Sequence, residues 1–74
     1  MPHINIKHFP KDFTGEERER LAESLTDVIT RHFGVSEDAV SVALEPVEQA
    51  VWNETVHGPE ITGRPHLLIK HPNY

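Results

Sequence analysis

The stretch TGEERERLAESLTDVITRHFG, residues 14–34, decides the fold because it carries both ends of a helix and its apolar face. Thr14 and Glu17 stand three residues apart, as the two members of a capping box do at a helix start. Gly34 suits the left-handed conformation that commonly ends a helix. The large apolar side chains between them recur at helical spacing, which predicts an amphipathic helix over 15–33. They are Leu21, Leu25, Val28, Ile29 and Phe33.

Two short stretches of alternating polarity flank this helix. In HINIKHF, residues 3–9, Ile4 and Ile6 alternate with polar side chains, which is typical of a half-buried strand. In AVSVALEP, residues 39–46, apolar side chains again occupy every second position, and the proline ends the strand. The order strand, helix, strand with short connections predicts a right-handed βαβ unit with parallel strands, an α/β fold.

The last third of the chain gives weaker signals. Residues 47–52 fit a short helix or a loop. HGPEITGRP, residues 57–65, holds two glycines and two prolines, which predicts mostly irregular structure. HLLIK, residues 66–70, is a candidate short strand, and residues 71–74 form a tail.

The size of the chain predicts a partner copy. A domain of 74 residues buries only about 60 % of the surface that its unfolded chain exposes, so a lone copy is marginally stable. The chain has no cysteine, so disulfides cannot help, and oligomerisation is the usual remedy that remains. Two copies joined edge to edge would form a shared four-stranded sheet with both helices on one face. We expect a homodimer, with a hexamer as the alternative.

The composition excludes several classes of function. The net charge of −5 disfavours a protein that binds nucleic acid through its phosphates. No apolar run approaches the ~18 residues of a membrane-spanning helix, so no membrane role is expected. The lack of cysteine fits a cytoplasmic protein. We expect residues 1–74 to form a single domain.

Pro2 is the candidate catalytic residue. Methionine aminopeptidase generally removes Met1 when the next residue is small, and Pro2 then carries a free secondary amine. An α-amino group ordinarily has a pKa of about 7.7–8.0. Pro2 shares the parity of Ile4 and Ile6, and an apolar surrounding lowers the pKa of such an amine. A neutral amine near pH 7 meets the condition for general acid–base catalysis.

The pattern Pro2-x-Ile4-x-Ile6, the capped helix, VSVALEP and the aromatic Trp52 after it together resemble the 4-oxalocrotonate tautomerase family. The resemblance covers nearly the whole chain. It implies a βαβ protomer assembled as a dimer or hexamer, and an amino-terminal proline that shuttles a proton between an enol and a keto acid. It further implies a small 2-keto or enol acid as substrate, such as an aryl pyruvate, and no cofactor, because the proton is all that moves.

The resemblance also implies three substrate-binding residues. Family members place one arginine after the first strand and another on the second strand. Here Lys11 lies near the first position, although Phe13 falls closer to it, and Ser41 occupies the second. A lysine lacks the bidentate fork of arginine, so a monocarboxylate is expected rather than a dicarboxylate. Trp52 matches the aromatic of the family's pocket, with a core or dimer-interface role as the alternative.

Other interpretations of the sequence remain open. The six histidines suggest no metal site, because His3 and His8, like His66 and His71, are five residues apart and face opposite sides of a strand. One alternative is a dehalogenase or decarboxylase, because relatives that this sequence resembles use the same proline for those reactions. If Met1 is retained, the chain is instead a non-enzymatic dimeric interaction module.

Overall fold

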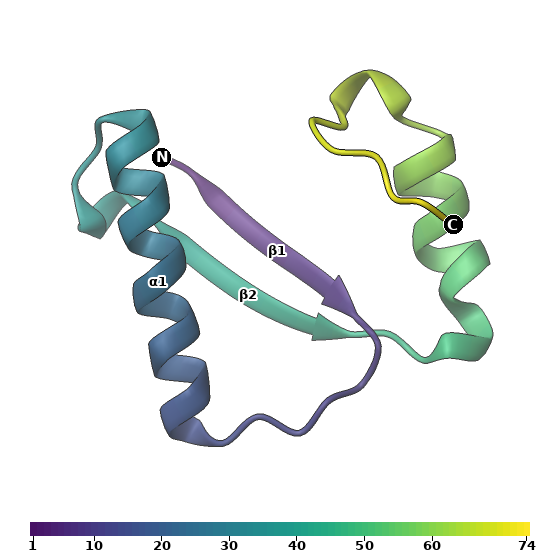
Figure 1. The fold of residues 1–74 in the computed structure, drawn as a ribbon, viewed down its shortest axis with the longest axis horizontal. Helices are drawn as coiled ribbons and strands as arrows, with labels where there is room; N and C mark the ends of the chain where they lie inside the picture. Colours follow the sequence, from purple (N-terminus) through teal and green to yellow (C-terminus); the bar gives the residue numbers. More distant parts are fainter.

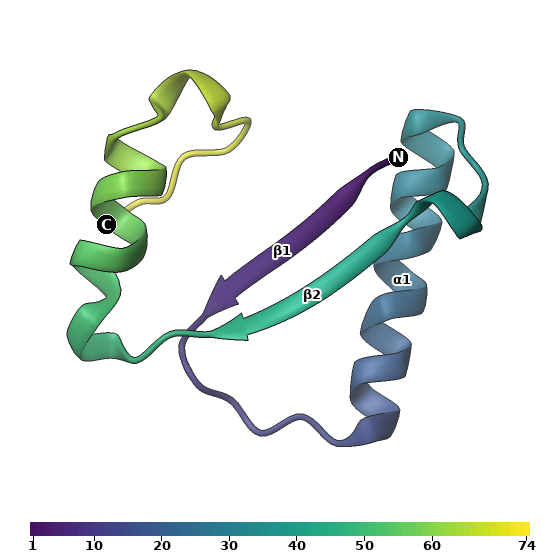
Figure 2. The same ribbon diagram turned by 180° about the vertical axis from the view of Figure 1, so that it is seen from behind.

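The structure is a computed structural model that describes residues 1–74, and it contains the predicted βαβ unit (Figures 1 and 2). Strand β1 spans His3–His8 and helix α1 spans Gly15–Phe33. A short 3-10 turn, Glu37–Ala39, leads into strand β2, Ser41–Pro46. The strands pair in parallel, with His3 opposite Ser41 and His8 opposite Pro46. The prediction of parallel strands joined by a helical crossover is confirmed.

Helix α1 begins and ends as its sequence predicts. The Thr14 hydroxyl accepts from the Glu17 N–H at 3.1 Å, and the Glu17 carboxylate accepts from the Thr14 N–H at 2.9 Å. Gly34 adopts φ 66°, a left-handed conformation in which a side chain would be strained. Both cap interactions are local, which is why the bounds 15–33 could be predicted from neighbouring residues alone.

The Thr14→Ala variant tests how much the cap stabilises the fold. Loss of an N-cap hydroxyl costs about 1 kcal/mol of the free energy of unfolding. For a domain of this size we expect the midpoint of thermal unfolding to fall by about 4–8 °C at fixed protein concentration. Circular dichroism at 222 nm measures it. An unchanged midpoint would show that the capping box is dispensable, and Thr55→Ala, an exposed position outside α1, is the matched control.

The capping box also predicts a pH dependence. Hydrogen bonds from the Thr14 backbone and side chain hold the pKa of Glu17 below its ordinary value of 4.5. A carboxylate whose pKa is lowered by folding contributes stability above about pH 4.5 and loses it as the pH falls through the folded pKa. We therefore expect Glu17→Gln to lose less stability than the wild type between pH 6 and pH 3. Glu19→Gln, at an exposed position of the same helix, is the control and should lose as much stability as the wild type. A loss in Glu17→Gln equal to that of the wild type and of the control would contradict the prediction.

The sheet has one apolar and one polar face. Alternation and register place Ile4, Ile6, Val42 and Leu44 on the same face, and β2 meets Leu21 and Ala22 of α1 there. On the opposite face, polar side chains of the two strands form cross-strand hydrogen bonds. The His3 ring Nδ1 lies 2.6 Å from the Ser41 hydroxyl, and Asn5 Nδ2 donates to Glu45 Oε1 at 2.9 Å.

Residues 47–74, here called the C-terminal arm, depart most from the predictions. The arm contains a 3-10 turn Gln49–Val51, a π-helix Asn53–Thr62 and a 3-10 turn Pro65–Leu67. In Figures 1 and 2 it stands beyond the carboxyl ends of the strands, on the opposite side of them from α1. The first turn agrees with the short helix considered for 47–52. The strand predicted over 66–70 is wrong, because this segment pairs with neither strand and begins within a turn.

The irregular structure predicted for 57–65 is also wrong for most of that segment. Pro59 lacks an N–H, yet the helix continues through it with wider hydrogen bonds. The Gly63 N–H reaches back five residues to the Gly58 carbonyl at 2.8 Å, and the Thr62 hydroxyl donates to the His57 carbonyl at 3.3 Å. A Cβ on Gly63 would lie 2.8 Å from the Gly58 carbonyl oxygen, so the turn depends on glycine at position 63.

The lone chain has almost no core. Only Val47 and Val56, both in the C-terminal arm, are buried, with 7 % and 6 % of their surface exposed. Large apolar side chains remain exposed along the chain, including Phe33 at 64 % and Ile69 at 104 %. None of the helices is long and apolar enough to cross a membrane. The apolar surface left open on the strands, α1 and the arm is what a partner copy would cover.

Candidate active site

The amino-terminal end of the sheet holds Pro2 in place. Pro2 is half-buried just before β1, and its carbonyl accepts from the Ser41 N–H of β2 at 3.2 Å. Met1 is fully exposed in front of it. Pro2 is therefore attached to a hydrogen-bonded sheet, while Met1 before it lies open to solvent.

Ser41 is engaged locally rather than open to a ligand. Its N–H holds Pro2 and its hydroxyl lies 2.6 Å from the His3 ring Nδ1. The side chain projects from the polar face of the sheet, whereas the Pro2 ring has the parity of the apolar face. The structure thus brings Ser41 next to Pro2 in the backbone, but its hydroxyl is already bonded to a neighbour.

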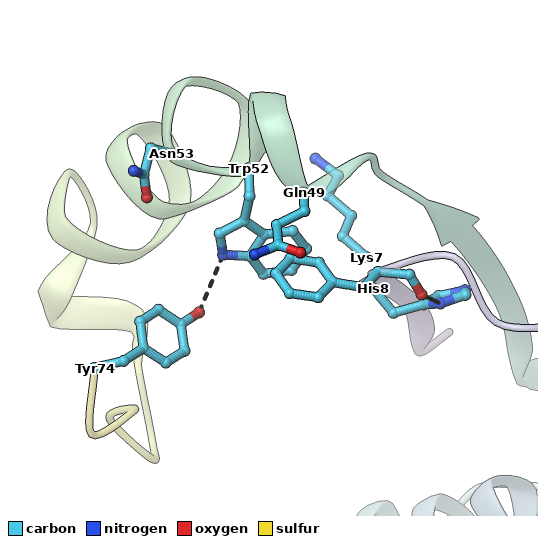
Figure 3. A pocket seen from close by; sticks show the side chains of 7 residues that line it. Lys7, His8, Gln49, Trp52, Asn53 and Tyr74 are labelled. Atoms are coloured by element: carbon cyan, nitrogen blue, oxygen red, sulfur yellow. Dashed lines mark hydrogen bonds between the residues drawn. The ribbon is translucent and has the colours of Figure 1, made fainter.

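A hollow of about 680 Å³ lies at the other end of the sheet, between the end of β1 and the C-terminal arm (Figure 3). Residues from three separate segments line it: the end of β1, the first turns of the arm, and the chain end. They are Lys7, His8, Phe9, Gln49, Trp52, Asn53 and Tyr74. Trp52, which the sequence predicted as a pocket aromatic, is among them.

Aromatic side chains shape this hollow. The rings of Phe9 and Trp52 meet edge to face, with centroids 5.0 Å apart. The Trp52 indole N–H donates to the Tyr74 hydroxyl at 3.2 Å, shown as the dashed line in Figure 3. The Tyr74 ring also packs against His57 with centroids 5.4 Å apart. The hollow therefore offers flat apolar faces with a polar edge, an arrangement that suits an aromatic ring with a polar substituent.

Lys7 supplies the positive charge of the hollow. It projects from the polar face of β1 and forms an ion pair with Glu60 of the π-helix. The hydrogen bond that Lys7 donates to Glu60 raises the pKa of Lys7 above its ordinary value of 10.5, and the negative charge of the nearby Glu45 adds to this. The side chain is 25 % exposed, so the ammonium is partly shielded but reachable.

Lys11 lies elsewhere. It is exposed in the loop before α1, and its ammonium sits 4.8 Å from the centroid of the Phe13 ring. It does not line the hollow that holds Trp52. The structure therefore does not bring together Lys11, Ser41 and Trp52, the three residues predicted to bind substrate.

Sequence reasoning missed Lys7, Phe9 and Tyr74. Lys7 appeared only as a polar residue of the alternating strand, because its partner Glu60 is 53 residues away along the chain. Phe9 follows the strand directly and Tyr74 stands at the chain end. One signal was present: Phe9 falls at a polar position of the strand alternation, and Trp52 and Tyr74 lie outside the predicted strands and helix.

Pro2 and the hollow lie at opposite ends of β1. His8 lies six residues after Pro2 along extended backbone, which corresponds to about 20 Å. Figure 1 shows the amino terminus beside the far end of α1, away from the C-terminal arm. Within one chain Pro2 therefore lies far from the hollow that Trp52 lines.

The chain combines a parallel βαβ fold with an anchored proline and an aromatic hollow. Residues 2–58 match the model of the family described as "Tautomerase enzyme". The chain belongs to this tautomerase family, which makes it an isomerase. The family resemblance of the sequence is confirmed.

Named relatives and a solved structure agree. Tautomerase PptA of Pectobacterium carotovorum is 43 % identical over 76 residues, covering 100 % of this chain and 97 % of the relative. Tautomerase PptA of Klebsiella pneumoniae is 45 % identical over 74 residues with the same coverage. The crystal structure of DmpI from Helicobacter pylori superposes with a TM-score of 0.56 at 26 % identity, covering 64 % of this chain and 73 % of that one.

Proposed function

We propose that this tautomerase interconverts the enol and keto forms of a small 2-keto acid such as an aryl pyruvate, with Pro2 as general acid and base. The observation that carries the proposal is the attachment of Pro2 to β2 through the Ser41 N–H. A terminal amine on a frayed tail samples many directions, whereas this one is fixed by the sheet. Removal of Met1 converts the Pro2 nitrogen from an amide to a basic secondary amine.

The reaction needs only a proton to move. The neutral Pro2 amine takes the hydroxyl proton of the enol, and the electron pair of that O–H bond forms the ketone. The resulting ammonium then delivers a proton to C3, where the former double bond supplies the electrons. The amine returns to its neutral state, so no cofactor is consumed. Such positioned proton transfer contributes about 10²–10⁴-fold to a rate.

The working site combines two copies of the chain. Pro2 and the hollow are about 20 Å apart in one protomer, and β1 has an edge that pairs with no other strand. A second copy whose β1 runs antiparallel along that edge would bring its Pro2 end toward the first copy's hollow. The same arrangement gives a shared four-stranded sheet, with both helices on one face and a dimer as the unit.

The character of the hollow favours an aromatic monocarboxylate. Phe9, Trp52 and Tyr74 provide flat apolar contacts, and Lys7 provides one cation. No second lysine or arginine lines the hollow, so a dicarboxylate would leave one charge without a partner. A cytoplasmic location and a single domain over residues 1–74 stay predictions.

The test is the conversion of enol-phenylpyruvate to its keto form, followed by ultraviolet absorbance. The protein is first weighed by mass spectrometry to establish that Met1 is absent. We expect conversion well above the buffer rate, saturable in substrate. Conversion no faster than buffer alone, on protein that lacks Met1, would refute the aryl pyruvate assignment.

A further inference from the structure

The ion pair between Lys7 and Glu60 sets Lys7 apart from the other cations of the chain. Lys7 alone among the lysines and arginines lines the hollow at the carboxyl end of β1. Lys11 lies over the Phe13 ring in the loop before α1, and Arg20 pairs with Glu16 on the exposed side of α1. A negatively charged ligand in the hollow would therefore meet one fixed positive charge.

The geometry leaves Lys7 able to bind a second partner. An ammonium group carries three N–H donors, and only Glu60 makes a hydrogen bond to this one. Glu60 belongs to the π-helix and does not line the hollow itself. Glu60 accepts a hydrogen bond from the Lys7 ammonium and so fixes the direction of that side chain.

The apolar part of the hollow lies beside this cation. Trp52 stands between the Lys7 side of the hollow and Tyr74 in Figure 3, and its ring meets Phe9 edge to face. A planar aromatic ring placed there contacts Trp52 while its acidic side chain extends toward Lys7.

We propose that Lys7, oriented by Glu60, binds the carboxylate of an aryl keto acid whose ring packs against Phe9 and Trp52. This assignment rests on the proposed tautomerase function and names the residue that selects a monocarboxylate. Lys7 is the binding residue, and Glu60 is a positioning residue that acts through it.

Trp52 is the chain's one tryptophan, so its fluorescence reports on the hollow directly. The experiment titrates the purified protein with 3-phenylpropionate and with the uncharged 3-phenylpropanamide. A charge-assisted hydrogen bond to a partly shielded ammonium corresponds to about a 10-fold preference or more for the acid. We expect the wild type and Arg20→Gln, which removes a cation and an ion pair elsewhere, to show this preference.

Two variants separate charge from structure. Lys7→Gln should lose the preference, with acid and amide binding equally, while the affinity for the amide stays within about 2-fold. Glu60→Gln removes the ion pair but keeps the ammonium and an amide oxygen that can still accept from it, so it should reduce the preference for the acid by less than Lys7→Gln does. In the phenylpyruvate assay Lys7→Gln should raise KM about 10-fold and leave kcat nearly unchanged.

Each other outcome overturns the proposal. An acid preference that survives in Lys7→Gln excludes Lys7 as the cation, and its loss in Lys11→Gln instead would move the role to that lysine. Equal losses in Lys7→Gln and Glu60→Gln would show that the ion pair only holds the arm. Because binding is measured without turnover, a Lys7-dependent preference in a protein that does not convert phenylpyruvate would sustain this inference and refute the proposed function.

Discussion

We expect the Pro2→Ala variant to lose at least about 100-fold in kcat for phenylpyruvate tautomerisation, with a smaller change in KM. Alanine in second position also permits removal of Met1, so the variant still has a terminal amine. That amine is primary and rotates freely, whereas the proline ring fixes the direction of the nitrogen. The loss in kcat therefore measures how much the fixed direction of the proline nitrogen contributes to catalysis.

An insertion separates position from basicity. A lysine placed between Met1 and Pro2 prevents removal of the methionine and leaves the Pro2 nitrogen as an amide. We expect activity to fall by about 10²–10⁴-fold, since an amide nitrogen has no useful basicity. Mass spectrometry verifies each amino terminus. If the inserted form keeps wild-type kcat, the proton is carried by another group and the role assigned to Pro2 is wrong.

The second large effect concerns the shared site. Pro2→Ala and Trp52→Ala should each be strongly impaired alone, but co-refolding the two in equal amounts should restore activity. In a mixed dimer one site carries both changes and the other carries neither. With random assortment half of the dimers are mixed and each has one intact site, so about a quarter of wild-type activity is expected.

The control for this mixing experiment is the dimer population itself. Native mass spectrometry counts the mixed species in the same sample. Restored activity in proportion to their abundance supports a site built from two copies. Mixed dimers that are abundant but no more active than the parent variants would contradict the shared site. They would mean that Pro2 and Trp52 of one chain act together, although β1 separates Pro2 from the hollow.

The fold could be predicted where the signals were local. Thr14, Glu17 and Gly34 act within a turn of the helix they bound, so the bounds of α1 follow from adjacent residues. The strand alternation is similarly short-ranged, and the right-handed crossover then fixes parallel pairing. The C-terminal arm escaped prediction because Gly58, Pro59 and Gly63 usually interrupt helices. Here wider hydrogen bonds accommodate them, a possibility that residue preferences do not reveal.

The lining of the hollow was anticipated only at Trp52, for a related reason, and the roles of the site residues stay predictions. Trp52 lines the hollow as the sequence suggested. Lys7 was not recognised, because its position in the hollow depends on Glu60, far along the chain and in the very segment whose helix was missed. Charge partners that meet only in three dimensions leave no periodic trace in the sequence. Lys11 attracted attention by its place in the loop, yet the Phe13 ring holds it apart from the aromatic hollow.

The bond between the Pro2 carbonyl and the Ser41 N–H has an evolutionary consequence. A main-chain amide makes it, so any residue except proline at position 41 can supply the same anchor. The contact that holds Pro2 to β2 is therefore insensitive to side-chain replacement. Substitutions at position 41 other than proline can change the polar face of the sheet and still leave this anchor in place.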